Sequence, residues 1–110
     1  MTRYHEFKVF YDLVSWPNAI DRCVARGASL ATIPAPEDDV LSSLTAASWI
    51  GLEDMATEGM WRWITGEPLG PTFWDSGEPS DGTFQNCGAA VAEGWHDRAC
   101  DILLPYLCER

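Results

Sequence analysis

Four cysteines in a chain of 110 residues are the feature that most constrains what this sequence can fold into. Cys23, Cys87, Cys100 and Cys108 form an even set in a short chain, which is typical of a disulfide framework with three possible pairings. A zinc site is the alternative, but the sequence has no Cys-x2–4-Cys pair and the remaining spacings suit zinc poorly. We therefore expect two disulfides and an oxidising compartment, since such bridges do not persist in the reducing cytosol.

The length and the composition indicate one compact domain over residues 1–110. A chain of 110 residues suits a single domain, and 46% apolar residues exclude simple disorder. No internal repeat and no linker divides the sequence. A domain of this size buries a modest fraction of its surface, so covalent or metal cross-links would add needed stability.

The charge of the chain excludes several classes of partner. The formal net charge is −10 and the seven basic residues are scattered, whereas nucleic-acid binding needs clustered Lys and Arg. No apolar stretch approaches the roughly 18 residues that a membrane span requires. The excess of acid is consistent with cation binding, and equally with plain solubility.

The N-terminus, residues 1–5, lacks the apolar segment of a signal peptide. Because the cysteine content points to an oxidising compartment, we expect a secreted or extracellular domain. Its export signal is then absent from this sequence, or the natural chain never had one.

The first third of the chain predicts a strand followed by a helix. Residues 4–9 alternate and carry aromatics, which favours a strand. Ser15 is a candidate N-cap and Gly27 a candidate C-terminal stop. The apolar stripe between them has helical spacing and consists of Trp16, Ala19, Ile20, Cys23 and Val24.

The rest of the chain predicts a second helix, three further strands and a long loop. The helix would begin in the Pro- and acid-rich residues 34–39 and bury Val40, Leu41 and Leu44. The strands are expected over residues 48–52, 87–91 and 103–108. Residues 66–86 are rich in Gly and Pro, and a loop of this length in a compact domain indicates function or an organising ligand.

These elements coincide with motifs that resemble the C-type lectin-like domain over nearly the whole chain. The motifs, in order, are Ser15-Trp16-x-x-Ala19-x-x-x-Cys23-x-x-x-Gly27, Leu30-Ala31-x-Ile33, Trp49-Ile50-Gly51-Leu52, Glu58-Gly59-x-Trp61-x-Trp63, Gly77-Glu78-Pro79, Trp95-x-Asp97-x-x-Cys100 and Cys108-Glu109. Each motif alone is weak, but the full set in this order is specific.

The resemblance implies an α+β fold in which two helices flank small antiparallel sheets and a long loop binds calcium and ligand. It also implies that Cys23 pairs with Cys108 and Cys87 with Cys100. At the positions Trp49, Trp61, Trp63 and Trp95 it implies packing in the core rather than contact with a ligand.

The resemblance further implies a site where calcium and a sugar bind together. Glu78 and Asp97 match the family's carboxylates. Ser80 stands where many members have Asn or Asp, Gln85 where many have Glu, and His96 where most have Asn. Calcium prefers oxygen, so His96 would donate to a sugar hydroxyl, bind a softer metal such as zinc, or mark a site that has lost its function. All five are candidate metal and carbohydrate ligands.

A second calcium position is implied beside the first. Its candidate ligands are Asp54, Glu58, Asp81 and Asn86, all with side-chain oxygens. This ion would order the loop without touching sugar; alternatively, these residues are ordinary loop acids.

The triplet Glu78-Pro79-Ser80 resembles some galactose-binding members, which makes galactose our preferred hexose over mannose. Galactose often stacks its apolar face on an aromatic ring, and Phe84, Phe73 or Trp74 could supply one.

Calcium-dependent carbohydrate binding is therefore the first hypothesis, and a domain that has lost sugar binding and recognises a protein is the second. Catalysis is not expected, because the cysteines are committed to bridges and no nucleophile motif accompanies the histidines. A single shallow sugar site binds weakly, so we expect a homodimer or oligomer to supply avidity.

Overall fold

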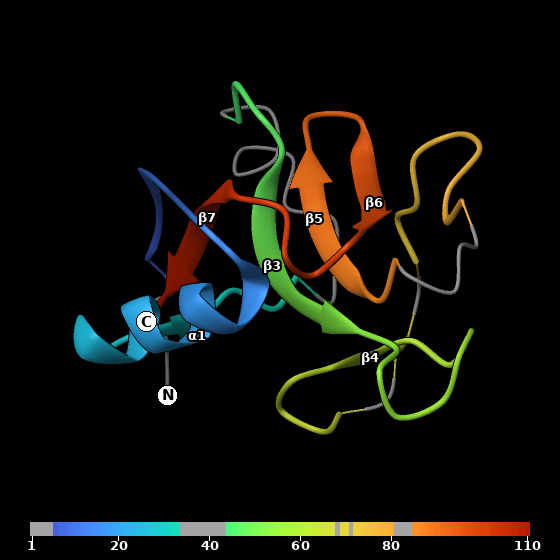
Figure 1. Ribbon diagram of the computed structural model, residues 1–110, viewed down its shortest axis with the longest axis horizontal. Coiled ribbons are helices and arrows are strands. Elements are labelled where there is room, and N and C mark those ends of the chain that lie inside the picture. The colour runs from blue at the N-terminus through green and yellow to red at the C-terminus, as the bar shows by residue number, and fades with distance from the viewer. Residues whose placement is uncertain (1–5, 34–43, 68, 71, 81–84) are drawn as a thin grey trace.

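The computed structural model describes residues 6–33, 44–67, 69–70, 72–80 and 85–110 (Figure 1). The described residues form one helix and seven strands. These are β1 Phe7–Val14, α1 Trp16–Ala25, β2 Ser29–Leu30, β3 Ser48–Glu53, β4 Arg62–Trp63, β5 Cys87–Val91, β6 Gly94–Arg98 and β7 Leu104–Glu109. No helix in these ranges has the length and apolar character needed to cross a bilayer.

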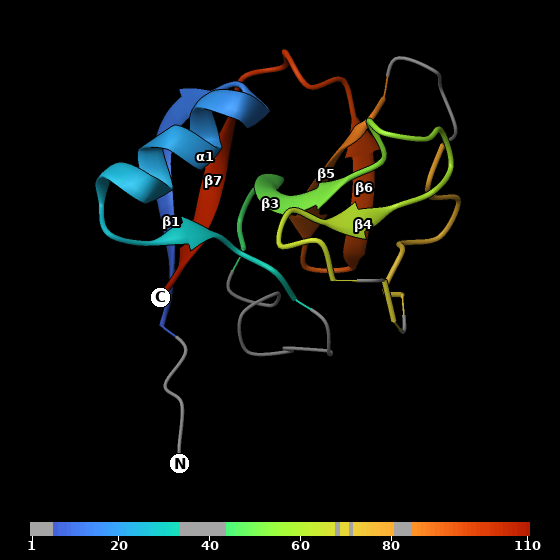
Figure 2. The same ribbon diagram turned by 90° about the horizontal axis from the view of Figure 1, so that it is seen from below.

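The strands join in one sheet with the order β1-β7-β3-β5-β6, to which β2 adds at β7 and β4 at β3. Neighbouring strands are antiparallel except β3 and β7, which meet in parallel at Trp49 and Tyr106. Figure 2 shows α1, β1 and β7 at one end of the molecule, and β4 and β6 at the other. The backbones of Glu6 and Arg110 exchange two hydrogen bonds of 2.9 and 3.1 Å, which extend the pairing of β1 with β7.

The predicted first helix is confirmed, and its buried stripe explains how it attaches to the sheet. Trp16, Ala19 and Cys23 are buried, and the Trp16 indole donates a 2.8 Å hydrogen bond to the carbonyl of Ile50 in β3. The helix ends before Gly27, whose φ of +72° suits glycine. Val24 was predicted on the buried stripe but is 62% exposed, because one residue turns the helix by about 100° away from Cys23.

The strand predictions at residues 48–52, 87–91 and 103–108 are confirmed to within one residue at each end. The first strand spans Phe7–Val14 and continues beyond the predicted end at Val9, because pairing with β7 resumes at Val14 after a bulge that follows Phe10. Tyr4, where the prediction began, lies outside the described residues. Sequence reasoning missed β6, whose Gly-Trp-His-Asp-Arg sequence has no clear alternation; its pairing with β5 creates the strand. The predicted second helix lies outside the described residues, apart from buried Leu44.

Two apolar clusters form the core. One lies between α1 and the sheet around Trp49 and Tyr106, and the other surrounds Trp63 and Trp95 on the side of the long loop. Trp49, Trp63 and Trp95 are buried and Trp61 is partly buried, as expected for structural tryptophans.

Both disulfides implied by the resemblance are present. Cys23–Cys108 ties α1 to β7 across a sequence separation of 85 residues, and Cys87–Cys100 joins the start of β5 to the segment after β6 across 13 residues. The longer bridge therefore closes most of the chain into one loop.

Replacing Cys23 and Cys108 together with alanine should lower the free energy of unfolding by about 4–5 kcal/mol, because the bridge restricts a long loop in the unfolded chain. The matched Cys87→Ala/Cys100→Ala variant should lose about 3 kcal/mol. Urea unfolding followed by circular dichroism measures both losses. A larger loss for the shorter bridge would contradict this ranking.

Candidate functional site

The candidate site forms where the long loop returns to the last strand of the sheet. The backbone of Trp95 in β6 donates to the carbonyl of Phe73 at 2.8 Å and accepts from the amide of Asp75 at 3.1 Å. Gly94 permits this approach, since a Cβ there would lie 2.5 Å from the Phe73 oxygen. The loop segment 73–80 is thereby held alongside β6.

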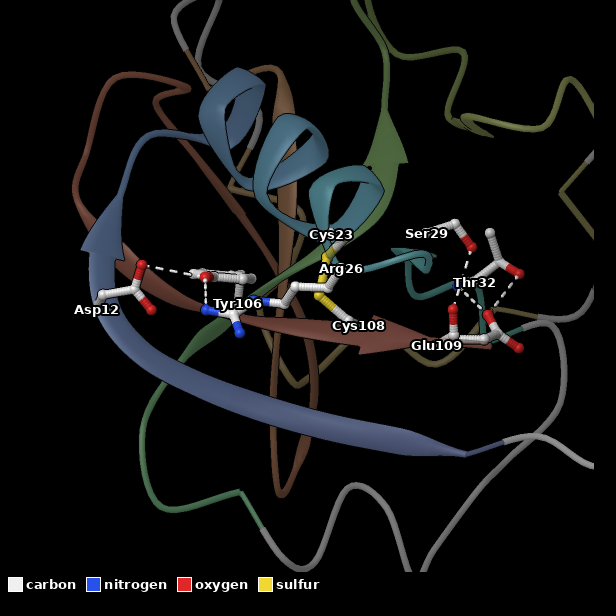
Figure 3. Close-up of a disulfide and its surroundings, with 8 residues drawn as sticks. All are labelled: Asp12, Cys23, Arg26, Ser29, Thr32, Tyr106, Cys108 and Glu109. Carbon is white, nitrogen blue, oxygen red and sulfur yellow. Dashed lines mark hydrogen bonds between the residues drawn. A yellow bond between two sulfur atoms is a disulfide. The ribbon is translucent and has the colours of Figure 1, made fainter.

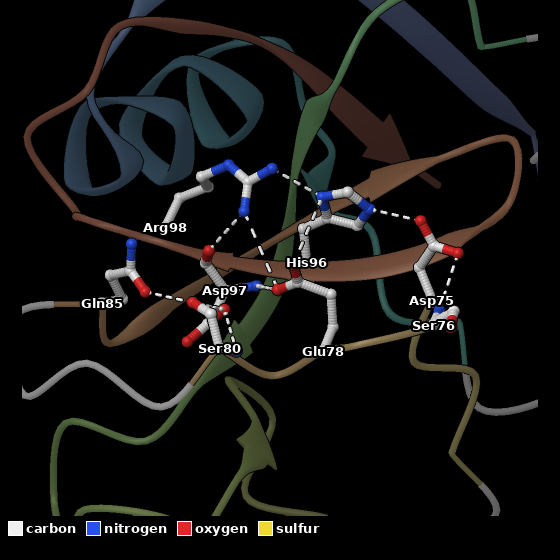
Figure 4. A network of polar contacts seen from close by, with 8 residues as sticks. All are labelled: Asp75, Ser76, Glu78, Ser80, Gln85, His96, Asp97 and Arg98. Atoms are coloured by element: carbon white, nitrogen blue, oxygen red, sulfur yellow. Dashed lines mark hydrogen bonds and ion pairs between the residues drawn. The ribbon is translucent and has the colours of Figure 1, made fainter.

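Four of the predicted site residues converge at this junction (Figure 4). The backbone amide and the hydroxyl of Ser80 each donate to Asp97 Oδ1 at 2.8 Å. The Asp97 amide donates to Glu78 Oε1 at 3.2 Å, and the Ser80 hydroxyl contacts Gln85 Oε1. The structure thus brings together two carboxylates, a hydroxyl and an amide oxygen. Asp97 lies 17 residues after Ser80 and 19 after Glu78 in the sequence.

Burial makes this group of oxygens electrostatically unfavourable without a cation. The Asp97 side chain is fully buried. Burial is also the main cause that raises the pKa of Glu78, and the hydrogen bond shared with the Asp97 side chain raises it further. A buried carboxyl group beside a partly buried one favours either a bound proton or a bound cation between them.

His96 does not point its ring nitrogens toward an open ligand position. Nε2 lies 2.8 Å from Asp75 Oδ2, and Nδ1 faces the Arg98 guanidinium. Because arginine only donates, Nδ1 accepts from Arg98 and Nε2–H donates to Asp75. The hydrogen bond from His96 lowers the pKa of Asp75. The structure therefore favours a positioning role for His96 over direct metal ligation.

Arg98 is a residue of the site that the sequence analysis did not identify. Its guanidinium donates to the Asp97 carbonyl at 2.7 Å and lies 3.8 Å from Glu78 Oε1. It offsets part of the negative charge that a cation would otherwise neutralise. The only sequence signal was a basic residue directly after the Trp-His-Asp triplet.

The residues predicted for the second calcium position are partly brought together. Asp54 is buried, its amide donates to the Asn86 carbonyl at 3.1 Å, and its Oδ2 accepts from the Gly59 amide at 2.8 Å. Asp54 Oδ1 is buried and has no hydrogen-bond partner in the described part of the chain. Glu58, four residues after Asp54, is exposed, and Asp81 lies outside the described residues.

The donors present suit a hard cation. Oxygen atoms alone are offered by Glu78, Ser80, Gln85 and Asp97, and the buried oxygen of Asp54 needs a partner. The described ranges contain no cluster of three or more His, Cys, Asp or Glu side chains arranged around one point. The two carboxylates of the main site would therefore need hydroxyl, amide or ligand oxygens to complete a coordination shell.

The candidate stacking rings divide into two groups. Phe73 and Trp74 pack edge to face against Trp95 at 5.4 and 5.6 Å, so most of their surface is used in the core. Trp74 nevertheless lines an open groove together with Pro79. Phe84 lies outside the described residues.

Replacing Glu78 with glutamine should stabilise the domain in the presence of a chelator at pH 7. The raised pKa means that the folded state holds the Glu78 proton more tightly than the unfolded state, so stability falls as pH rises through that pKa. Glutamine removes this penalty. Urea unfolding should show a higher free energy of unfolding for the variant at pH 7. The difference should disappear near pH 3, where residue 78 is neutral in both proteins.

Asp75→Asn should act in the opposite direction. The lowered pKa of Asp75 gives stability above the ordinary Asp pKa that is lost as pH falls, so the variant should be less stable at pH 7 and equal at low pH. Exposed Glu93→Gln is the control and should change neither curve. A loss of stability in Glu78→Gln at pH 7 would contradict the electrostatic argument.

Comparison with known proteins identifies relatives of this chain. Residues 12–110 match the family model described as "Lectin C-type domain". The chain is 34% identical over 103 residues to CD209 antigen-like protein D of Mus musculus, covering 87% of this chain and 44% of that protein. It is also 34% identical over 109 residues to C-type mannose receptor 2 of Homo sapiens, covering 92% and 7%. The chain thus spans less than half the length of these relatives.

Solved structures agree. The cow C-type carbohydrate-recognition domain of CD23 matches with a TM-score of 0.87 and 29% identity, covering 99% of this chain and 89% of that one. The mouse scavenger receptor C-type lectin domain matches with a TM-score of 0.89 at 23% identity, covering 100% and 91%, which supports the fold alone. A calcium-independent type II antifreeze protein matches with a TM-score of 0.84 and 26% identity, covering 100% and 88%. On the family match, the relatives and the fold together, this chain belongs to the C-type lectin domain family.

Proposed function

We propose that this domain binds carbohydrate in a calcium-dependent manner at the junction of the long loop and β6. The observation that carries the proposal is the contact of partly buried Glu78 with buried Asp97, with the oxygens of Ser80 and Gln85 around them. The resemblance of the sequence to the family implies that these residues match positions at which calcium and sugar are held. A cation there would relieve the electrostatic penalty that raises the Glu78 pKa.

The chain's own residues would supply both the orientation and the hydrogen bonds. Calcium, when bound, adds coordination positions that vicinal sugar hydroxyls can fill. Glu78 and Gln85 would accept hydrogen bonds from those hydroxyls, while the two bonds from Ser80 hold Asp97 in place. Recognition of a diol in this manner needs no deep pocket.

The residues Asp54, Glu58, Asp81 and Asn86 would hold a second calcium ion that orders the loop. The support is the buried Asp54 oxygen without a partner in the described ranges, and the proximity of the Asn86 backbone. This ion would not contact sugar.

Galactose is the proposed hexose, on the basis of Glu78-Pro79-Ser80. Trp74 is the described ring best placed to contact a ligand, because it shares a groove with Pro79. The relatives do not decide the hexose: one is named a mannose receptor, and the CD23 domain was crystallised in the presence of GlcNAc2Man3 oligosaccharide. Direct competition between the two sugars is therefore needed.

The setting proposed for this activity is extracellular, and the activity is binding without catalysis. Several copies would be needed for useful avidity, since single shallow sites bind weakly. A related receptor, Clec4f of Kupffer cells, is described as trimeric.

Recognition of a protein is the second candidate function, and Arg98 is the observation that favours it. Its guanidinium already places a positive charge 3.8 Å from Glu78, which weakens the requirement for calcium. The calcium-independent antifreeze protein shows that this fold can operate without the ion.

Titration calorimetry with galactose and with mannose, in millimolar calcium and again after chelation, tests the proposal. We expect heat with galactose, an affinity on the order of 1 mM, and its loss on chelation. Heat with mannose alone would overturn the hexose assignment. No heat with either sugar would favour the protein partner.

Asp97→Asn should lower the affinity for calcium and for sugar at least about tenfold, since it removes a buried anionic ligand while keeping the shape of the side chain. Glu93→Gln, in the turn between β5 and β6, is the matched control and should bind as the natural chain does. Equal sugar binding by Asp97→Asn would contradict the assignment of the site.

A further inference from the structure

The basic side chains of this acidic domain divide into those that pair with a carboxylate and those that do not. Arg22, Arg62, Arg98 and Arg110 each lie within 4 Å of an acid, with distances of 3.1, 2.9, 3.8 and 3.6 Å. Lys8 and Arg26 form no ion pair with the described residues. In a chain that carries 17 acidic residues, two cations without a carboxylate partner among the described residues are unexpected.

Both of these cations lie over the same aromatic ring. The guanidinium carbon of Arg26 is 3.7 Å from the centre of the Phe10 ring, and the Lys8 ammonium is 5.5 Å from it. Phe10 stacks in turn on Tyr106 at 5.5 Å. The ring attracts both cations, and it cannot neutralise either charge.

A chain of hydrogen bonds fixes the direction of Arg26 (Figure 3). Its Nη2 donates to the Tyr106 hydroxyl at 3.3 Å, and that hydroxyl donates to Asp12 Oδ2 at 3.0 Å. Stacking and this bond together hold the guanidinium plane in place while most of its five N–H groups stay available. Orientation of this kind reduces the entropy lost when a ligand binds.

The two cations line a pocket of about 240 Å³ at the end of the sheet formed by β1 and β7. Two acids and a third basic residue also line it, but these are engaged elsewhere. Glu6 pairs with Arg110, and Glu109 accepts from the backbone amide of Thr32 at 2.9 Å. Glu109 keeps its negative charge, so beside the Glu6–Arg110 pair the pocket carries the two cations of Lys8 and Arg26 and one carboxylate, which leaves a net positive charge for a ligand.

We propose that this pocket binds an oxyanion, the carboxylate or sulfate group of an acidic ligand, between Lys8 and Arg26. A guanidinium offers paired donors that match the geometry of such groups, and an ammonium adds a second charge. The net charge of −10 repels anions over most of the surface, so the attraction must come from this local pair. The site lies on β1, β7 and the end of α1 and does not depend on the calcium site on β6.

Titration with sodium sulfate and, separately, sodium acetate tests the proposal, with sodium chloride at equal ionic strength as the reference. The experiment is done in chelator, so its result is independent of calcium. Proton–nitrogen NMR spectra should show saturable shifts of the Ala28 amide and the Arg26 side-chain N–H. The two salts decide whether carboxylate or sulfate is preferred.

Arg26→Gln and Lys8→Gln should each weaken binding about tenfold, since each removes one charged partner. Arg62→Gln, which removes an exposed arginine paired with Glu53 outside this pocket, is the matched control and should leave binding unchanged. Lys8 is exposed, so its variant keeps the test valid if loss of Arg26 disturbs the end of α1. Shifts that do not saturate, or that survive in both variants, would show that Arg26 only stabilises the helix end and would overturn the proposal.

Discussion

The disulfide between Cys23 and Cys108 is the constraint on which the rest of the structure depends. It attaches α1 to β7, and β7 is the strand that contacts β1, β2 and β3. With β7 held, Glu6 pairs with Arg110 and the first core cluster closes between helix and sheet. A domain of this size has little apolar surface to spare, so a covalent link across most of its length replaces stability that a larger core would provide.

The second disulfide acts at the functional end of the molecule. Cys87–Cys100 encloses the hairpin of β5 and β6, and β6 carries His96, Asp97 and Arg98. The described part of the long loop has little regular structure of its own, and its position comes from hydrogen bonds to this hairpin and from aromatic packing on Trp95. The rigid hairpin therefore determines where the loop presents Glu78 and Ser80.

The site combines groups that oppose folding with groups that support it. The raised pKa of Glu78 marks a penalty for burial beside Asp97, whereas the lowered pKa of Asp75 marks a favourable bond to His96. Arg98 joins the two sets, since it contacts His96, the Asp97 carbonyl and the neighbourhood of Glu78. Buried charges that destabilise a fold are common where a protein binds an ion or a ligand.

The sequence by itself determined the first helix and most strands through apolar periodicity, and its ordered motifs determined the family resemblance, which implied the two disulfide pairings that the cysteine count alone left open. It also supplied Glu78, Ser80, Gln85 and Asp97 as one candidate set. Only the tertiary structure revealed β6 as a strand, the engagement of both His96 nitrogens, the place of Arg98 in the site and the cation pair over Phe10. Each of these depends on contacts between segments distant in the chain, or on directions of side chains, and neither is encoded in the pattern of one segment.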